Sequence, residues 1–281
     1  MRATSYSAFA SDLRNKGIVY AAERAKSLGF ESVEFIDYPA ANRPWLYDAF
    51  NADELYAELQ RQGLSVGCYS LGVRLQAGDP EEVLAHVFRE IAFAAKLHAP
   101  FFHHTVTLDC TPTEKDPTYR EMLKKVLPLT VAIANKCAEY GIICLYEPQG
   151  LYFNGRRGLT KFFKIMKKRC PNVAICGDLG NSLDVDEDPA KVIRKLAKYV
   201  AHVHIKDCKY DVDENEYKVS YKSKNGKNIH ECAIGKGDID LAACIKYLRK
   251  AGYDGRVSFE VSGTDEQLRD AIAYTKALWG N

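Results

Sequence analysis

The sequence predicts a single domain with the (β/α)8 barrel, or TIM barrel, fold over residues 1–281. Short apolar runs rich in β-branched residues alternate with segments of helical apolar spacing, and this alternation repeats eight times. Such alternation indicates parallel strands covered by helices. Barrels of this kind close within about 250 residues as one domain. An open doubly wound sheet is the alternative, but no GxGxxG motif follows the first predicted strand.

The predicted elements follow one another along the whole chain. Strands are predicted at residues 5–9, 32–36, 65–70, 101–105, 142–147, 173–178, 200–204 and 257–260. Helices are predicted at residues 18–28, 52–62, 80–97, 118–140, 159–168, 189–199, 240–251 and 266–279. Glycines suited to C-caps close several of these helices, and Pro80 opens one that has acidic residues in its first turn. Pro128 is expected to kink or break its helix.

Composition and charge narrow the class of protein. The chain is 47% hydrophobic and 27% charged with a formal net charge of +2, which is ordinary for a soluble globular protein and offers no bulk attraction to nucleic acid or membranes. No apolar run reaches the roughly 18 residues of a membrane span, and the first residues lack a signal-peptide core. Nine cysteines without a CxxC pair indicate a reducing cytoplasm rather than a disulfide framework.

Four predicted strands end in residues that commonly bind metals. Glu147, Asp178, His204 and Glu260 lie at the carboxyl ends of the last four strands. Those ends meet at the active-site face of a barrel, so the side chains should converge. Three carboxylates and one imidazole make a mostly hard site, suited to Mn²⁺, Mg²⁺ or Co²⁺, with Zn²⁺ as a further option. His202 shares the strand face of His204 but lies lower, and it is expected to be a core histidine.

Other polar residues at strand ends are candidates for binding a substrate. His103 and His104 end the fourth predicted strand, and one of them should face the pocket; we favour His104. Glu34 ends the second predicted strand, and Lys206 lies two residues beyond His204 on the same strand face. Each of these residues could instead be structural, with its polar atoms satisfied inside the protein.

One connection is longer than the others. Residues 210–229, in the loop after the seventh strand, are mainly polar, and alternating Tyr217, Val219 and Tyr221 precede an Asn-Gly pair. This pattern predicts a β-hairpin. Because the βα loops of a barrel lie at its active-site face, we expect the insertion to be a lid or an interface element, with a decorated solvent loop as the alternative.

The same motifs resemble those of a known family. Together with the early segment Gly29-Phe-Glu-Ser-Val-Glu34, these motifs resemble those of the xylose-isomerase-like superfamily. Within that superfamily they are similar to the sugar phosphate isomerase/epimerase group, which includes ketose 3-epimerases, hydroxypyruvate isomerases and inosose dehydratases. The resemblance spans nearly the whole chain and implies that the four strand-end residues bind Mn²⁺ or a similar ion. The segments that carry it are Tyr146-Glu147-Pro148, Gly177-Asp-Leu-Gly-Asn181, His202-Val-His-Ile-Lys-Asp207, Ala233-Ile-Gly-Lys-Gly-Asp-Ile-Asp240 and Phe259-Glu260-Val261.

The resemblance implies a metal-dependent isomerase or epimerase that acts on a sugar or keto-sugar. The metal would polarise the substrate carbonyl and stabilise an enediolate. Either Glu147 or Glu260 would remove the α-proton, and the other carboxylate would return one. Loss of a leaving group from the same enediolate would make the protein a lyase instead. Such a lyase would resemble an inosose dehydratase or would eliminate a group from an oxidised glycoside.

The sequence departs from the ketose 3-epimerase pattern at two positions. Asn181 stands where those enzymes often carry a substrate-binding His, so Asn181 becomes a candidate substrate contact. No Arg occurs among residues 206–210, where the epimerases carry one shortly after the metal-binding His. Both differences weaken the specific assignment to a free-ketose epimerase and leave room for the lyase.

Two other functions of the superfamily are disfavoured. A DNA-repair endonuclease would need more histidines than the seven present and a basic surplus for the phosphate backbone. A catalytically inactive binding subunit is disfavoured by the complete set of ligands. The expected partner is therefore a small sugar or keto-sugar, and the resemblance leaves a homo-oligomer open.

Overall fold

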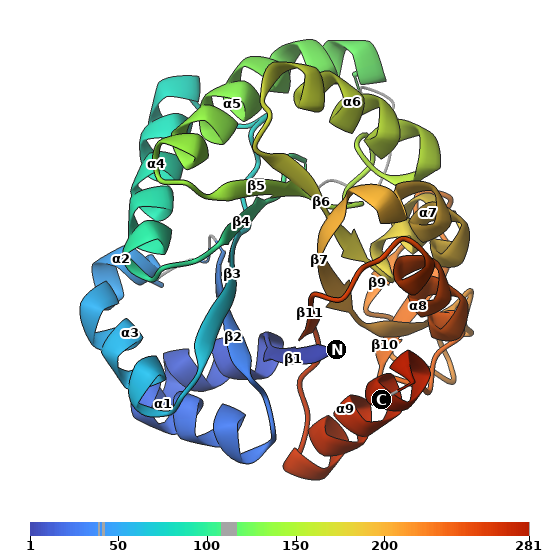
Figure 1. The fold of residues 1–281 in the computed structure, drawn as a ribbon. Coiled ribbons are helices and arrows are strands. Elements are labelled where there is room, and N and C mark those ends of the chain that lie inside the picture. The colour runs from blue at the N-terminus through green and yellow to red at the C-terminus, as the bar shows by residue number, and fades with distance from the viewer. Residues whose placement is uncertain (39, 41–42, 108–116, 281) are drawn as a thin grey trace.

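The computed structural model describes residues 1–38, 40, 43–107 and 117–280, and these form a closed barrel of parallel strands surrounded by helices (Figure 1). Around the barrel the strands follow the order β1-β11-β7-β6-β5-β4-β3-β2, which confirms the predicted fold. The strand bounds are β1 Arg2–Ser5, β2 Ser32–Asp37, β3 Ser65–Leu71, β4 Phe101–His104, β5 Ile143–Tyr146, β6 Val173–Asp178, β7 Val200–Ile205 and β11 Arg256–Phe259.

Helices connect successive strands and form the outer layer. Several begin at a side chain that accepts a backbone N–H hydrogen bond, as N-caps do, including Asn51, Asp79, Thr118, Asp188 and Thr264. No helix in the described ranges is long and apolar enough to cross a membrane. The helix bounds are α1 Ser7–Ser27, α2 Leu46–Ala49, α3 Ala52–Arg61, α4 Pro80–Lys96, α5 Tyr119–Glu139, α6 Thr160–Arg169, α7 Pro189–Leu196, α8 Leu241–Lys250 and α9 Asp265–Trp279.

The first strand and helix differ from the sequence prediction. Residues 5–9 were expected to form a strand, but β1 ends at Ser5 and α1 begins at Ser7. The backbone of β1 pairs in parallel with β11, so its register depends on a strand at the far end of the chain. Phe9 and Leu13 are buried on one side of α1, which continues past a kink at Gly17, where φ is +82°. Long-range pairing therefore overrides a weak local strand signal.

Pro128 does not break its helix. Helix α5 runs through Pro128 from Tyr119 to Glu139. Pro128 itself is exposed, whereas Val126 and Leu129 beside it are buried against the barrel. The carbonyl without a proline N–H to bond belongs to Lys124, which is exposed as well, so water can satisfy it on this side of the helix.

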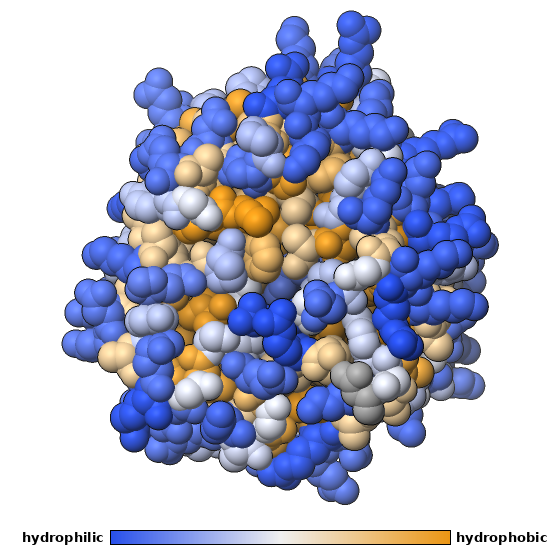
Figure 2. Space-filling view, viewed as in Figure 1, coloured by the Kyte–Doolittle hydropathy of each residue, from blue (hydrophilic) through white to orange (hydrophobic). Residues whose placement is uncertain are grey.

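The apolar core lies mainly between the strands and the helices. It contains large buried rings from strands and helices alike, such as Phe35, Phe102 and Phe162. A smaller apolar cluster comes from alternate residues of the strands and fills the lower barrel interior; its buried members are Cys68, Leu145 and Cys176. Figure 2 shows hydrophilic side chains around the rim of the molecule and more apolar ones nearer the middle of this face. The remaining barrel interior is polar, so its groups need partners inside the protein.

The insertion forms a small antiparallel sheet beside the barrel. Strands β8 Asp207–Tyr210, β9 Tyr221–Lys222 and β10 Asn228–Cys232 pair in the order β8-β10-β9. The sheet is anchored to Asp186, in the loop after β6, through the hydroxyls of Tyr210 (2.6 Å) and Ser223 (2.5 Å). A hairpin is thus present, but its first strand begins at Tyr221 rather than at residue 217. A role as lid or interface element stays a prediction.

A buried carboxyl group lies in the helix layer. Glu90 of α4 is fully buried, and the Tyr69 hydroxyl donates a hydrogen bond to one of its oxygens. Its other oxygen has no hydrogen-bond partner, and His86 Nε2 lies 3.8 Å away. Burial raises the pKa of Glu90 to about 8, so this carboxyl should be protonated at neutral pH.

We expect this group to make stability fall as pH rises. Between its ordinary pKa of 4.5 and about 8, Glu90 holds a proton in the folded state that the unfolded state has lost. Over that window the loss should reach about 2 to 5 kcal/mol in the free energy of unfolding. Glu90→Gln should flatten this pH dependence and exceed the wild-type stability at pH 8. Urea unfolding of both proteins from pH 5 to pH 8 tests this; parallel curves would contradict it.

Candidate metal centre

The four predicted ligands come from neighbouring strands of the barrel. Glu147 follows β5, Asp178 ends β6, His204 lies in β7 and Glu260 follows β11, and these strands are consecutive in the barrel order. Asp178 is the register partner of His204. Side chains alternate between the two faces of a strand, and these residues are on the inner face at the carboxyl end.

Two of the carboxylates approach one nitrogen of His204. Nδ1 of His204 lies 3.2 Å from Oε2 of Glu147 and 3.9 Å from Oε2 of Glu260. One ligand atom each from Asp178, His204 and Glu260 lies within 4.8 Å of the others, and the same holds for Glu147, Cys176 and His204. The structure therefore brings the three carboxylates and the imidazole together.

The hydrogen bonds and burial of the Asp178 carboxylate suit a bound cation. Its Oδ1 accepts backbone hydrogen bonds from Gly180 (2.7 Å) and Asn181 (2.6 Å), which fix the carboxylate at the strand end. Its Oδ2 is buried and has no hydrogen-bond partner. Burial raises the pKa of Asp178 to about 7. The Lys206 ammonium lies 3.6 Å from Oδ2, too far for a hydrogen bond, and a divalent ion bound there would satisfy this buried oxygen.

The thiol near the site is a poor ligand by comparison. Cys176 is fully buried in β6, and burial raises the pKa of its thiol to about 12. It is therefore protonated at neutral pH, whereas metals bind the thiolate. The effective donors are three carboxylates and one imidazole, a set that suits Mn²⁺, Mg²⁺, Co²⁺ or Zn²⁺.

Glu147 is held by two histidines. His103 Nε2 lies 3.1 Å from Oε1 of Glu147, and His204 contacts the other oxygen. Burial alone would raise the pKa of Glu147, but the two histidines outweigh it and bring the pKa below its ordinary range. Glu147 is therefore ionised and oriented toward His204.

The histidine that faces this site is His103 and not the favoured His104. Successive residues of β4 point to opposite faces. Nδ1 of His104 lies 2.9 Å from its neighbour's carbonyl, Thr105 O, and its ring packs on Tyr146 and Phe102 in the layer beneath the helices. His104 thus lies on the other side of the barrel wall from His103.

Lys206 and Asn181 contact each other at the edge of the site. Lys206 Nζ donates to Oδ1 of Asn181 at 2.9 Å and pairs with Oε1 of Glu260 at 2.9 Å. It also lies 3.6 Å from Oδ2 of Asp178. Burial would lower the pKa of Lys206, but Asp178 and Glu260 raise it well above its ordinary value, so the side chain stays positively charged. A role in substrate binding stays a prediction for both residues.

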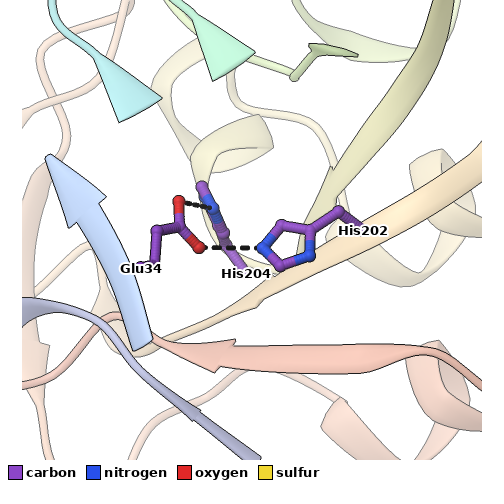
Figure 3. A group of neighbouring side chains, drawn as sticks. All are labelled: Glu34, His202 and His204. Carbon is purple, nitrogen blue, oxygen red and sulfur yellow. Dashed lines mark hydrogen bonds and ion pairs between the residues drawn. The ribbon is translucent and has the colours of Figure 1, made fainter. Parts of the chain in front are cut away.

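Glu34 lies below the candidate ligands and not at the mouth of the barrel. It is fully buried, and its two oxygens contact Nε2 of His204 (2.9 Å) and Nε2 of His202 (2.8 Å), as Figure 3 shows. His202 is also fully buried, at the level expected for a core histidine. Histidines thus contact both oxygens of Glu34, and a role in substrate binding stays a prediction.

Tyr6 is a site residue that the sequence reasoning missed. Its ring stacks on His204 with 4.9 Å between ring centroids. Tyr6 directly follows β1, so it occupies the same kind of strand-end position as the four predicted ligands. Correct bounds for the first strand would have identified it.

Two cavities meet at Glu260. One, of about 430 Å³, is lined by Lys206, by Glu231 and Cys232 of β10, and by residues near the start of α9. The other, of about 410 Å³, is lined by Tyr6, Tyr38 and residues of α1. Glu260 and Ser7 belong to both linings, so a small molecule in either cavity can contact Glu260. The insertion forms part of the wall of the larger cavity.

Comparison with known proteins agrees with this architecture. A family model described as a xylose isomerase-like TIM barrel matches residues 22–278. None of the curated proteins matches the sequence. A D-psicose 3-epimerase from Clostridium cellulolyticum H10 superimposes with a TM-score of 0.74 at 16% identity, with 99% of each chain covered.

Two further solved structures share the fold. The IOLI protein with a bound zinc atom has a TM-score of 0.73 at 15% identity, covering 99% of this chain and 96% of its own. The probable 3-DHS dehydratase AsbF from Bacillus anthracis has a TM-score of 0.71 at 14% identity, covering 98% of this chain and 99% of its own. At such identities the likeness is one of fold.

Proposed function

The chain belongs to the family of xylose isomerase-like TIM barrels, and from this premise we propose that it is a divalent-metal-dependent isomerase or epimerase of a sugar or keto-sugar. The solved structures that share this fold include enzymes, among them an epimerase and a probable dehydratase. The observation that carries the proposal is the gathering at His204: Asp178 and Glu260 form one group of ligand-type atoms with it and Glu147 forms another, and Oδ2 of Asp178 is buried without a hydrogen bond.

The four side chains would hold the metal. Glu147, Asp178 and Glu260 would each offer a carboxylate oxygen, and His204 would offer Nδ1, its atom nearest to Glu147 and Glu260. A bound divalent ion would supply Lewis acidity, which polarises a carbonyl and favours the negative charge that develops as a proton leaves. Mn²⁺ is our first expectation because the donors are mainly carboxylates, and Zn²⁺ is supported by the zinc atom of the IOLI protein.

Proton transfer would be the work of the two glutamates. Glu147 and Glu260 both approach His204 Nδ1, so a substrate near that point would lie beside two carboxylates. One carboxylate removes the proton from the carbon next to the carbonyl, and the other returns a proton. Return to the opposite side of the same carbon gives an epimer, and return to the neighbouring carbon gives an aldose–ketose isomer.

Neighbouring cations and rings would assist these steps. Lys206 is charged and pairs with Glu260, so it can orient this carboxylate and hydrogen-bond a substrate oxygen. Tyr6 covers His204 with its ring and limits the access of water to the site.

The free cysteines of the described residues are consistent with a reducing cytoplasm.

A lyase is the second candidate. The dehydratase AsbF shares the fold, and the insertion sheet adds a wall to the cavity at Glu260 that could accept a leaving group. The same proton removal followed by loss of a hydroxyl or an aglycone would give this outcome. Lys206, adjacent to Glu260, could then stabilise the departing oxygen.

Proton NMR in D₂O distinguishes these reactions. The Mn²⁺-loaded protein is incubated with ketoses, keto-inositols and 3-keto-glycosides, and each product is examined after the metal is removed. Deuterium at an α-carbon with every hydroxyl retained is expected for the isomerase or epimerase, and the labelled carbon identifies which. Deuterium together with loss of a hydroxyl or aglycone identifies the lyase. Absence of exchange in the whole panel would contradict both.

A further inference from the structure

Glu34 is bonded on both of its oxygens at the centre of the barrel. Oε1 accepts from the Ser70 hydroxyl at 2.6 Å and contacts Nε2 of His204 at 2.9 Å. Oε2 contacts Nε2 of His202 at 2.8 Å and accepts from the Ser258 hydroxyl. These partners come from β3, β7 and β11, so one fully buried carboxylate joins strands on different sides of the barrel.

The contacts determine where the ring protons lie. An ionised carboxylate only accepts hydrogen bonds, so His202 and His204 must each donate from Nε2. Without a metal, Nδ1 of His204 also meets the ionised Glu147 carboxylate at 3.2 Å and would donate to it; a cation bound at the centre would displace that proton and leave a lone pair on the nitrogen opposite Nε2. For His204 that nitrogen is Nδ1, which faces Glu147 and Glu260. Glu34 thus favours the one tautomer of His204 that can bind a cation at the candidate centre.

A closed ring of contacts links Glu34 to Glu147. On one side, His204 bridges the two carboxylates through Nε2 and Nδ1. On the other side, the Ser70 hydroxyl contacts Glu34 and Nδ1 of His103, and Nε2 of His103 contacts Glu147 at 3.1 Å. The orientation of the candidate base Glu147 is therefore tied on both sides to the position of Glu34.

We propose that Glu34 is a positioning residue for the metal centre, acting through His204 and, by way of Ser70 and His103, on Glu147. It holds His204 with its proton on Nε2 and its Nδ1 toward the other ligands, and it keeps Glu147 turned to the same point. Carboxylates that orient metal-binding histidines in this way strengthen binding. The inference rests on the proposed metal centre but not on any particular reaction.

A second metal site at Glu34 itself is the competing explanation. Glu34, His202 and His204 do lie close enough together to be ligands. However, both oxygens of Glu34 already have two partners each, and Nε2 of each histidine already contacts that carboxylate. Because these hydrogen bonds already occupy both oxygens of Glu34, its carboxylate is better suited to orienting ligands than to binding an ion.

The test compares Glu34→Gln with wild type and with Glu90→Gln. Whichever way the Gln side chain at position 34 is placed, its NH₂ would face the Nε2–H of His204 or of His202, so one of these two adjacent rings must rotate or change tautomer, and the support of His204 is disturbed. We expect the Kd for Mn²⁺, measured by calorimetry, to rise about 10- to 100-fold in Glu34→Gln. Glu90→Gln removes another fully buried carboxyl group, outside the barrel interior, and should leave the Kd unchanged. A Kd for Glu34→Gln within about threefold of wild type would overturn the proposal.

The tautomer of His204 gives an independent readout. In long-range ¹⁵N–¹H spectra of the Zn²⁺-loaded wild-type protein, the proton should be on Nε2 of His204. A proton on Nδ1 would overturn the proposal even if Glu34→Gln does not fold. Glu34→Asp keeps an ionised acceptor, so it should retain the Nε2–H tautomer and lose less affinity than Glu34→Gln; an affinity equal to that of Glu34→Gln would count against the proposal. None of these readouts uses turnover, so an incorrect reaction assignment would not affect them.

Discussion

Glu147→Gln and Glu260→Gln should each lower the rate of α-proton exchange by about 10²- to 10⁴-fold. Gln has nearly the shape of Glu but cannot take up a proton at neutral pH. Glu147 is ionised and held between His103 and His204, so its replacement removes an oriented base. Glu260 contacts both cavities and pairs with Lys206, so its replacement removes the second carboxylate.

The loss of a proton acceptor must be separated from the loss of a metal ligand. We would measure exchange of solvent deuterium into the substrate identified by the NMR panel, at saturating Mn²⁺ and with metal content determined for each variant. Glu90→Gln is the control because it makes the same substitution at a buried carboxyl group in the helix layer, and it should exchange at the wild-type rate. Near-normal exchange in either Glu147→Gln or Glu260→Gln would rule out the mechanism with two carboxylates.

Metal binding should stabilise the folded protein, and Asp178→Asn should abolish most of this effect. An ion that binds only the folded state adds about 2.7 kcal/mol at a free concentration of 100 times its Kd. For a chain of this length that corresponds to a rise in Tm of roughly 5 °C or more. Asn at position 178 keeps the Oδ1 acceptor for Gly180 and Asn181 but puts an uncharged NH₂ in place of Oδ2, the oxygen that makes no hydrogen bond.

Thermal unfolding with EDTA and with Mn²⁺ measures this effect. Wild type and Glu90→Gln should show the same rise in Tm on adding Mn²⁺. Asp178→Asn should show little rise, while its Tm in EDTA stays close to that of wild type because the loop contacts remain. An undiminished rise in Asp178→Asn would place the ion elsewhere, and no rise in wild type would contradict the proposed centre.

Local sequence pattern predicted the barrel and the residues at its strand ends. Strands β2 to β7 and β11 were recognised from apolar, β-branched runs, which reflect burial on both strand faces. A barrel gathers its strand ends, which predicts that Glu147, Asp178, His204 and Glu260 meet, and in the structure the three carboxylates lie near His204. The first strand was misplaced because residues 2–5 are short and pair with the far end of the chain.

The local sequence of β4 does not predict which of its residues face the barrel interior. Phe101, Phe102, His103 and His104 form two equivalent alternating pairs, so the sequence gives no preference between the two histidines. The register decides: His103 is the partner of Leu145, which shares the inner face with Glu147. A shift of one residue would exchange the positions of His103 and His104.

The sequence by itself therefore determined the fold class and the polar residue types at four strand ends, because both depend on periodicity within single segments. The tertiary structure decided that His103 supports Glu147, that Tyr6 covers His204, and that Glu34 contacts His202 and His204. These contacts join residues far apart in the chain, such as Glu34 and His204, and they depend on the register and closure of the barrel. No local pattern encodes that closure, since it arises only when the last strand pairs with the first.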